Sequence, residues 1–358
     1  MSRVDVVVPC YNYARFLDRC VESLLGQDGA EVRILVIDDA STDDTPAVGA
    51  RLAAADARVT FRRHPVNQGH IATYNEGLLG WADAEYALLI SADDVVAPGA
   101  FRRAIAFLDR HPEAGMVYGM ARVIIDDAGP PAETGPVPAE SRIVGGADFL
   151  RHCCERAHCP VSTPTAVVRT TVQQTLGGYA ADLPHSADLE MWMRFAMRGP
   201  IGVLRSVQAY YRWHASNMAS RYYNQRLGDR QEFLLTCHRM LGRSGERYPG
   251  AAPWMVSMHR LVAEEAVHSA NKCFDLGDDE SSRAWLALAR ELDPTIRSTR
   301  AWWRSRAGRL LGRPLVNAIR PVLHRLRGLP PQPPVTIDAT HFRGFRPGEF
   351  VGWWPETP

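Results

Sequence analysis

Three short polar segments follow three apolar runs of the kind that form buried strands, and they carry most of the side chains able to do chemistry. They are Pro9-Cys10-Tyr11-Asn12, Asp38-Asp39-Ala40-Ser41 and Ser91-Ala92-Asp93-Asp94. A carboxylate such as Asp39 can accept the imide N–H of a pyrimidine base, and Tyr11 can stack on that base. Asp93 and Asp94 offer the oxygen ligands that Mg²⁺ or Mn²⁺ prefers when it bridges phosphates.

Each of these residues also has an ordinary structural interpretation. Asp39 fits a helix cap or a turn, and an Asp pair shortly before Pro98 fits a tight turn. In an open parallel sheet, however, the ligand crevice lies beyond the carboxyl ends of the strands, where successive loops diverge. Aromatic, amide and carboxylate groups converge at that edge, which favours a nucleotide site over three unrelated turns.

The elements that must position these groups alternate in type over residues 4–121. The strand-like runs are VDVVVP, VRILVID, VTFRR and YALLIS. Helical patterns separate them, and we expect helices to begin near Ala14, after Pro46 and near His70. Strands that alternate with helices of this length indicate βαβ units. The predicted fold class is therefore α/β, a Rossmann-like, mostly parallel sheet flanked by helices, with a helical C-terminal extension.

The rest of the chain is less regular. Residues 126–142 are rich in Pro, Gly and Glu and are expected to form a surface loop. Helices are expected over residues 147–155 and 188–198, followed by an extended AYYRWH, and residues 221–292 have a largely helical pattern. We expect these parts: a domain of residues 1–218 with halves 1–121 and 122–218, a helical region of residues 219–328, and a Pro-rich tail of residues 329–358.

The composition limits the class of protein. The 358 residues are 46% hydrophobic and 23% charged, with a formal net charge of +1. This is typical of a soluble globular protein, and the balanced charge gives no reason to expect a nucleic-acid partner. No apolar run is long enough to span a bilayer, and the N-terminus lacks the layout of a signal peptide. We expect a cytoplasmic protein, peripheral at the inner face of the membrane if it contacts one.

One segment departs from this charge balance. Residues 297–327 contain nine arginines and no acid, and Trp302, Trp303 and several leucines recur at near-helical spacing, interrupted by Pro314 and Pro321. A helix docked on the core with solvated arginines is the simplest interpretation. Attachment to an anionic membrane surface is the second and would suit a lipid-linked acceptor; nucleic-acid binding is the third and the least favoured.

Four segments in order and spacing point to one family. They are VVVPCYNYARFLDRCVESLLGQ, ILVIDDASTDDT, NQGHIATYNEGL and LLISADDVVAPGAF. Together they resemble the nucleotide-binding half of family 2 glycosyltransferases with the GT-A fold, and the resemblance runs over residues 4–217. It implies inverting transfer from a nucleotide diphosphate sugar, with UDP or dTDP as the expected carrier and Mn²⁺ or Mg²⁺ as cofactor. The acceptor, whether glycan, lipid-linked or small molecule, stays open.

The resemblance also implies roles for individual residues. HSADLEMWMRFA is similar to the segment that supplies the general base, here Asp188, and YRWHASNMAS to the segment whose histidine, here His214, joins Asp94 at the metal. An acceptor hydroxyl needs such a base because it is a poor nucleophile until a carboxylate takes its proton. A register shifted by two residues makes Glu190 the base instead. The implied donor-binding residues are Pro9, Tyr11, Asn12, Asp39, Asn67 and Asp93.

Some features depart from the family pattern. Ser91 and Ala92 stand where many relatives have an acid, so the metal has fewer expected protein ligands, and Ala187 replaces a frequent Glu. The Gln-x-x-Arg-Trp segment of processive synthases is missing, which favours transfer of a single sugar. A sugar nucleotidyltransferase would need a Gly-rich triphosphate loop that VVVPCYNYA does not supply. A non-catalytic sugar-nucleotide or glycan-binding protein on a decayed scaffold is the alternative.

The cysteines offer a further candidate site. His152-Cys153-Cys154 with His158-Cys159 suggests zinc, but the spacing is not C-x-x-C, and adjacent cysteines on a regular helix cannot both face one ion. We expect buried or partly buried, reduced thiols beside the acceptor cleft.

Overall fold

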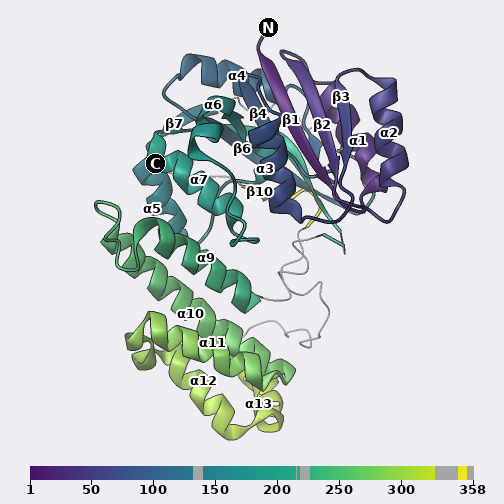
Figure 1. The fold of residues 1–358 in the computed structure, drawn as a ribbon. Coiled ribbons are helices and arrows are strands. Elements are labelled where there is room, and N and C mark those ends of the chain that lie inside the picture. Colours follow the sequence, from purple (N-terminus) through teal and green to yellow (C-terminus); the bar gives the residue numbers. More distant parts are fainter. Residues whose placement is uncertain (132–139, 215, 218–225, 327–345, 353–358) are drawn as a thin grey trace.

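The computed structural model describes residues 1–131, 140–214, 216–217, 226–326 and 346–352 (Figure 1). The strands are β1 Arg3–Cys10, β2 Glu31–Asp38, β3 Val59–Arg63, β4 Tyr86–Leu89, β5 Val95–Val96, β6 Met116–Ile125, β7 Glu140–Val144, β8 Val167–Arg169, β9 Ile201–Trp213 and β10 Phe350–Val351. The helices are α1 Ala14–Leu25, α2 Thr45–Ala55, α3 His70–Gly80, α4 Ala100–Arg110, α5 Gly146–Arg156, α6 Thr170–Leu176, α7 Ala187–Arg198, α9 Arg226–Leu241, α10 Ala252–Leu276, α11 Asp279–Leu292, α12 Arg300–Leu311 and α13 Arg313–Leu326.

The first four long strands form the parallel part of one sheet, whose order is β3-β2-β1-β4-β8-β6-β9-β5. Successive side chains of β1 enter two cores: Val6 and Val8 pack on the face that α1 and α4 cover, and Val7 packs on the opposite face. Burial on both faces explains why the predicted runs of β1, β2 and β4 are mostly apolar, and Asp5 and Arg33, which interrupt the first two, pair with each other. The expected starts of α1 and α3 are confirmed, and α2 begins one residue before Pro46.

Beyond β4 the sheet becomes mixed. β8 pairs antiparallel with β4 and β6, whereas β9 runs parallel to β6. The expected loop over residues 126–142 is wrong at its end, because residues 140–144 form β7 and pair antiparallel with β9. The edge of β9 supplies backbone hydrogen-bond partners for β7, and the local composition of residues 140–144 gives no sign of them. The expected boundary between the two halves, after Ala121, falls inside β6.

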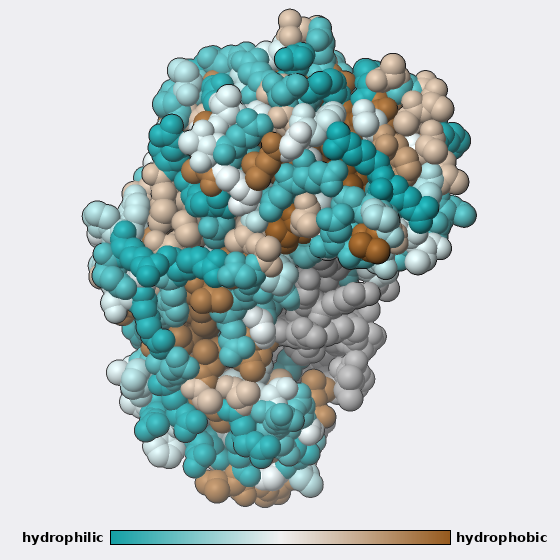
Figure 2. Space-filling view, in the orientation of Figure 1, coloured by the Kyte–Doolittle hydropathy of each residue, from teal (hydrophilic) through white to brown (hydrophobic). Residues whose placement is uncertain are grey.

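The C-terminal extension is a stack of helices, α9 to α13, below the sheet domain (Figure 1). Hydrophobic residues lie on the surface at its far end, where α12 and α13 are found (Figure 2). Pro321 does not interrupt the predicted amphipathic segment: the chain turns at Gly312, which has a φ of +78°, and α13 continues past Pro321. From the tail, β10 returns to pair with β6, so its described part wraps the domain.

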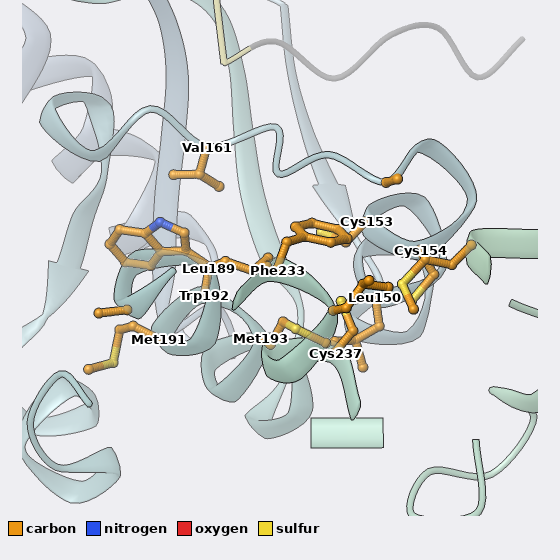
Figure 3. Close-up of a cluster of buried hydrophobic side chains, with 14 of the residues drawn as sticks. Leu150, Cys153, Cys154, Val161, Leu189, Met191, Trp192, Met193, Phe233 and Cys237 are labelled. Carbon is orange, nitrogen blue, oxygen red and sulfur yellow. The ribbon is translucent and has the colours of Figure 1, made fainter. Parts of the chain in front are cut away.

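The extension shares a hydrophobic core with the sheet domain. One cluster of buried side chains runs from Val7 of β1 to Trp302 of α12. In Figure 3, Phe233 and Cys237 of α9 lie among side chains of α5 and α7, including Trp192. The seven cysteines are free, and Cys153, Cys154 and Cys237 are among the five that are buried.

A membrane span requires a helix that is long and has few polar residues. Over the described part of the chain, every helix is too short or too polar to cross a bilayer.

Candidate active site

The loops after β1 and β2 are held together by Asn12. Its backbone N–H donates to Ser41 Oγ at 2.8 Å, and its Oδ1 accepts from the backbone N–H of Thr42 at 2.8 Å. Asn12 has a φ of +59°, in the left-handed region that Asn tolerates better than most residues. The Asn12 prediction therefore has a structural basis in loop geometry, while the neighbouring Tyr11 is exposed and its ring is available for stacking.

Asp39 is buried, and the protein itself occupies most of its hydrogen-bonding capacity. Oδ1 accepts from the backbone N–H of Gln68 at 2.7 Å, and Oδ2 accepts from that of Gly69 at 2.8 Å. His64 Nδ1 lies 2.8 Å from Oδ1 as well. Asn67 adds a bond from Nδ2 to the Asp39 backbone oxygen at 3.1 Å. A carboxylate oxygen has about two acceptor positions, so one position on Oδ2 is left for a ligand.

His64 is a partner that sequence reasoning missed. Its two ring nitrogens lie 2.8 Å from Asp39 Oδ1 and 2.8 Å from Glu76 Oε2. Burial by itself lowers the pKa of His64, but the two carboxylates outweigh it and leave the pKa above its ordinary value. No spacing rule marks this histidine, because its partners are 25 and 12 residues away.

The acid pair lies after β4, at the same edge of the sheet. Asp93 and Asp94 are both buried, and Oδ1 of Asp94 accepts from the backbone N–H of Arg212 on β9 at 2.8 Å. Burial and the charge of Asp93 hold the pKa of Asp94 well above its ordinary value. The two predicted acids are therefore side by side in a desolvated site, where a positive charge is strongly favoured.

Arg212 is the nearest fixed positive charge. Its guanidinium is buried against the Phe16 ring, 4.7 Å from the ring centroid, and its Nε donates to the Asp93 backbone oxygen at 2.7 Å. Its Nη2 is buried without a hydrogen-bond partner in the described structure. The resemblance of YRWHASNMAS to the family segment implies a role for His214 only, although Arg212 lies in the same segment.

His214 contacts the acid pair from the end of β9. Its Nε2 lies 3.1 Å from Asp93 Oδ2, and its Nδ1 lies 2.9 Å from Ser216 Oγ. The ring packs against Tyr13 and Phe16 with centroids 5.4 and 4.9 Å away. The structure thus brings His214 to Asp93, and both ring nitrogens are engaged.

Asp188 lies in the first turn of α7. Oδ1 accepts from the backbone N–H of Leu189 at 2.7 Å, and Oδ2 accepts from Thr163 Oγ1 at 3.4 Å. Burial outweighs these bonds and raises its pKa from 3.8 to about 6. The rival Glu190 is differently engaged, because its Oε2 accepts from Arg194 Nε at 3.0 Å and Nη2 at 2.8 Å.

Comparison with known sequences finds a glycosyltransferase domain in the N-terminal part of the chain. Residues 5–149 match the model for Glycosyl transferase family 2. An uncharacterised protein of Mycobacterium tuberculosis is 25% identical over 286 residues, which are 74% of this chain and 85% of that protein. An uncharacterised glycosyltransferase of Haemophilus influenzae is 23% identical over 225 residues, 61% of this chain and 68% of that protein. Residues 5–149 therefore carry a glycosyltransferase family 2 domain, and proteins named as glycosyltransferases resemble the chain beyond it.

Two solved structures share the fold of this transferase. TarS of S. aureus, in complex with UDP, has a TM-score of 0.51 at 18% identity, with 83% of this chain and 91% of that chain covered. The mannosyltransferase PcManGT of Pyrobaculum calidifontis, in complex with GDP-Man and Mn²⁺, has a TM-score of 0.51 at 20% identity, with 81% and 85% covered. At these identities the likeness establishes the fold, GT-A, and not the substrate.

The acid pair of the transferase is suited to a divalent cation. Mg²⁺ and Mn²⁺ bind through one or two protein carboxylates, and phosphate oxygens and water complete the shell. Oδ2 of Asp94 accepts from no donor among the described residues, which leaves it open to such an ion. Within that same part of the chain, no group of three or more His, Cys, Asp or Glu is arranged to hold a metal. A cation at Asp94 would therefore depend on phosphate for much of its shell.

Proposed function

We propose that this transferase moves a single sugar from a UDP- or dTDP-sugar to an acceptor hydroxyl, with inversion and with Mn²⁺ or Mg²⁺ bound at Asp94. The observation that carries the proposal is the buried Asp93–Asp94 pair at the sheet edge where the loops after β1 and β2 also meet. Two desolvated carboxylates without a full set of donors favour a cation and the diphosphate that accompanies it.

The donor class is supported by the structural neighbours. TarS structures contain UDP or UDP-GlcNAc, and PcManGT contains GDP-Man with Mn²⁺. For this chain the pyrimidine preference depends on Asp39, whose remaining acceptor position on Oδ2 suits an imide N–H, and on stacking by Tyr11. Pro9, Asn12 and Asn67 are proposed to shape the same pocket, because they lie in or beside the loops that hold Asp39.

The diphosphate gathers negative charge as the sugar bond breaks, and a cation held by Asp94 and Asp93 would offset that charge. We assign His214 to this site as well. Its Nε2 contact with Asp93 supports a role in orienting that carboxylate, and direct ligation would require the contact to open. The buried guanidinium of Arg212 adds fixed positive charge beside the pair.

Asp188 is proposed as the general base. Its carboxylate takes the proton of the acceptor hydroxyl, the hydroxyl oxygen bonds to the anomeric carbon, and the bond from that carbon to the diphosphate breaks with its electron pair on the leaving group. This single displacement inverts the anomeric centre. A pKa of about 6 supports the role, because such a group is ionised at neutral pH yet more basic than an ordinary Asp. Glu190 is a weaker candidate, because Arg194 engages one of its oxygens through two bonds.

The proposed organisation keeps residues 1–218 as the transferase domain, residues 219–328 as the helical region and residues 329–358 as the tail. A cytoplasmic location also stays a prediction.

Calorimetric titration with UDP, dTDP and GDP, each with and without Mn²⁺, tests the donor site. The expected result is metal-dependent binding that is tighter for the pyrimidine diphosphates. Metal-dependent binding of GDP alone would contradict the role of Asp39, and metal-independent binding would contradict that of Asp94. A donor sugar that binds but is neither transferred nor hydrolysed would favour the alternative, a non-catalytic binding protein on the same scaffold.

A further inference from the structure

The far end of the C-terminal extension exposes an apolar surface. Trp303, Leu310 and Leu311 of α12 are 64%, 84% and 53% exposed, and Leu315 and Ile319 of α13 are exposed as well. These five residues are called the apolar end face here. Figure 2 shows hydrophobic residues at this end of the molecule, farthest from the sheet. Large apolar side chains gathered on one exposed surface mark a contact site for a partner.

The face is distinct from the side of α12 that holds the helix to the protein. Trp302 and Ser305 are buried, and Arg309 donates to the Ala270 backbone oxygen at 3.0 Å and to Asn271 Oδ1 at 3.0 Å. The exposed pair Trp303 and Leu310 is seven residues apart and therefore shares one side of the helix. The core of the protein covers one side of α12, and among the described residues nothing covers Trp303 and Leu310 on the other side.

The charge around the face identifies the kind of occupant. Residues 297–327 carry nine arginines and no acid. Arg300, Arg304 and Arg306 are exposed, and none has a partner among the residues that the structure describes. A second copy of this chain would set these arginines against one another, whereas an anionic surface would neutralise them.

We propose that the apolar end face and its arginines form a docking surface for an anionic lipid bilayer. An apolar patch rimmed by arginine, with a tryptophan in it, suits the boundary between lipid headgroups and acyl chains. A nucleic acid would match the charge but offers no apolar phase for Leu310 or Leu315. Docking brings the transferase to a surface where a lipid-linked acceptor is available. The binding itself does not require the proposed reaction, so the two proposals fail separately.

Flotation of the full chain with vesicles tests the surface. Vesicles of phosphatidylcholine alone and vesicles with about 30% phosphatidylglycerol are compared at low salt and at 0.5 M NaCl. The expected result is binding to the anionic vesicles that weakens strongly in high salt. Each arginine near an anionic surface strengthens binding by roughly fivefold, so replacing Arg300, Arg304 and Arg306 with Gln should weaken it about a hundredfold.

The apolar contribution needs its own variant and control. Leu310→Glu with Leu315→Glu should weaken binding to anionic vesicles at least about tenfold, since charged side chains are expelled from the acyl region. Val256→Glu, at an exposed apolar position on α10 whose exposed fraction lies between those of Leu310 and Leu315, should leave binding unchanged. Circular dichroism and UDP titration show that each variant is folded.

Four outcomes would overturn the proposal. They are no binding of the wild type to anionic vesicles, binding that the double Leu variant retains, tighter binding to a DNA duplex that the Leu variant also retains, and a wild-type dimer in light scattering that the Leu variant loses. The third would assign the arginines to nucleic acid without the apolar end face, and the fourth would assign the face to self-association.

Discussion

The raised pKa of Asp188 links catalysis to stability and gives the sharpest test of its role. If Asp188 is the base, kcat/KM should follow its ionisation: about 90% of the plateau at pH 7 and about 10% at pH 5, for a pKa of about 6. Asp188→Asn should lower kcat by about 10²–10⁴-fold and leave UDP binding unchanged.

The same residue should weaken the fold at neutral pH. A carboxyl whose pKa is raised from 3.8 to about 6 binds more protons in the folded state, so its unfavourable contribution is absent below about pH 4 and complete above pH 6. A pKa of Asp188 raised from 3.8 to about 6 corresponds to on the order of 3 kcal/mol, an upper limit for this partly buried group. An Asn oxygen still accepts from the Leu189 N–H, and its amide can donate to Thr163 Oγ1.

Urea unfolding at several pH values measures this directly. The variant should be more stable than the wild type by on the order of 1–3 kcal/mol at pH 7, and the difference should vanish near pH 4. Glu190→Gln is the matched control: it should lose stability at pH 7 because the partly buried Arg194 keeps its bonds to the Leu176 and Gly178 backbone oxygens but loses its carboxylate partner. A flat activity profile between pH 5 and 8, or an Asp188→Asn enzyme within about tenfold of wild type, would refute the assignment.

Three further changes test the rest of the site. Asp94→Asn should abolish the Mn²⁺-dependent part of UDP binding, measured by calorimetry, and leave metal-free binding unchanged. Glu232 Oε1 accepts from the N–H groups of His185 and Ser186 just before α7, so Glu232→Ala should cost about 1–3 kcal/mol in urea unfolding and lower kcat more than donor KM rises. His64→Gln should raise donor KM. Because the pKa of His64 is raised in the folded state, protonated His64 stabilises the fold, and this stabilisation is complete below pH 6.5. The difference in unfolding free energy between wild type and variant should therefore shrink as the pH rises above 6.5.

The parallel half of the sheet was predictable because its information is local. β1, β2 and β4 are buried on both faces, so each is a mostly apolar run, and the intervening helices begin at or within a residue of the expected positions. The mixed half of the sheet could not be predicted in this way. β6 finds its parallel partner β9 more than eighty residues later, and β7 forms only because β9 offers an edge. Neither pairing leaves a periodic signal in its own segment.

The candidate site likewise contains residues whose position is predictable from local sequence and contacts that are not. The positions of Asp39, Asp93 and Asp94 follow from their place after strands that share one edge, so the sequence alone places these three residues at the same edge of the sheet. Their surroundings were not predictable: His64 reaches Asp39 from the end of β3, and the Arg212 guanidinium reaches Asp93 across 119 residues of chain. The pKa of Asp188 depends on burial by segments that only the fold assembles.

The C-terminal extension is better understood as part of the catalytic unit than as an appendage. Glu232 of α9 holds the backbone that leads into α7 and Asp188, and Phe233 packs in the core that contains Trp192. Without α9, residues 1–218 would lose both contacts. A hydrophobic face of α7 would be exposed to water, and the N–H groups of His185 and Ser186 would lose their acceptor on Glu232. From there α10, 25 residues and about 37 Å long, leads towards the end where α12 and α13 lie. The helices therefore help to position Asp188, the proposed base, at one end and carry the proposed membrane contact at the other.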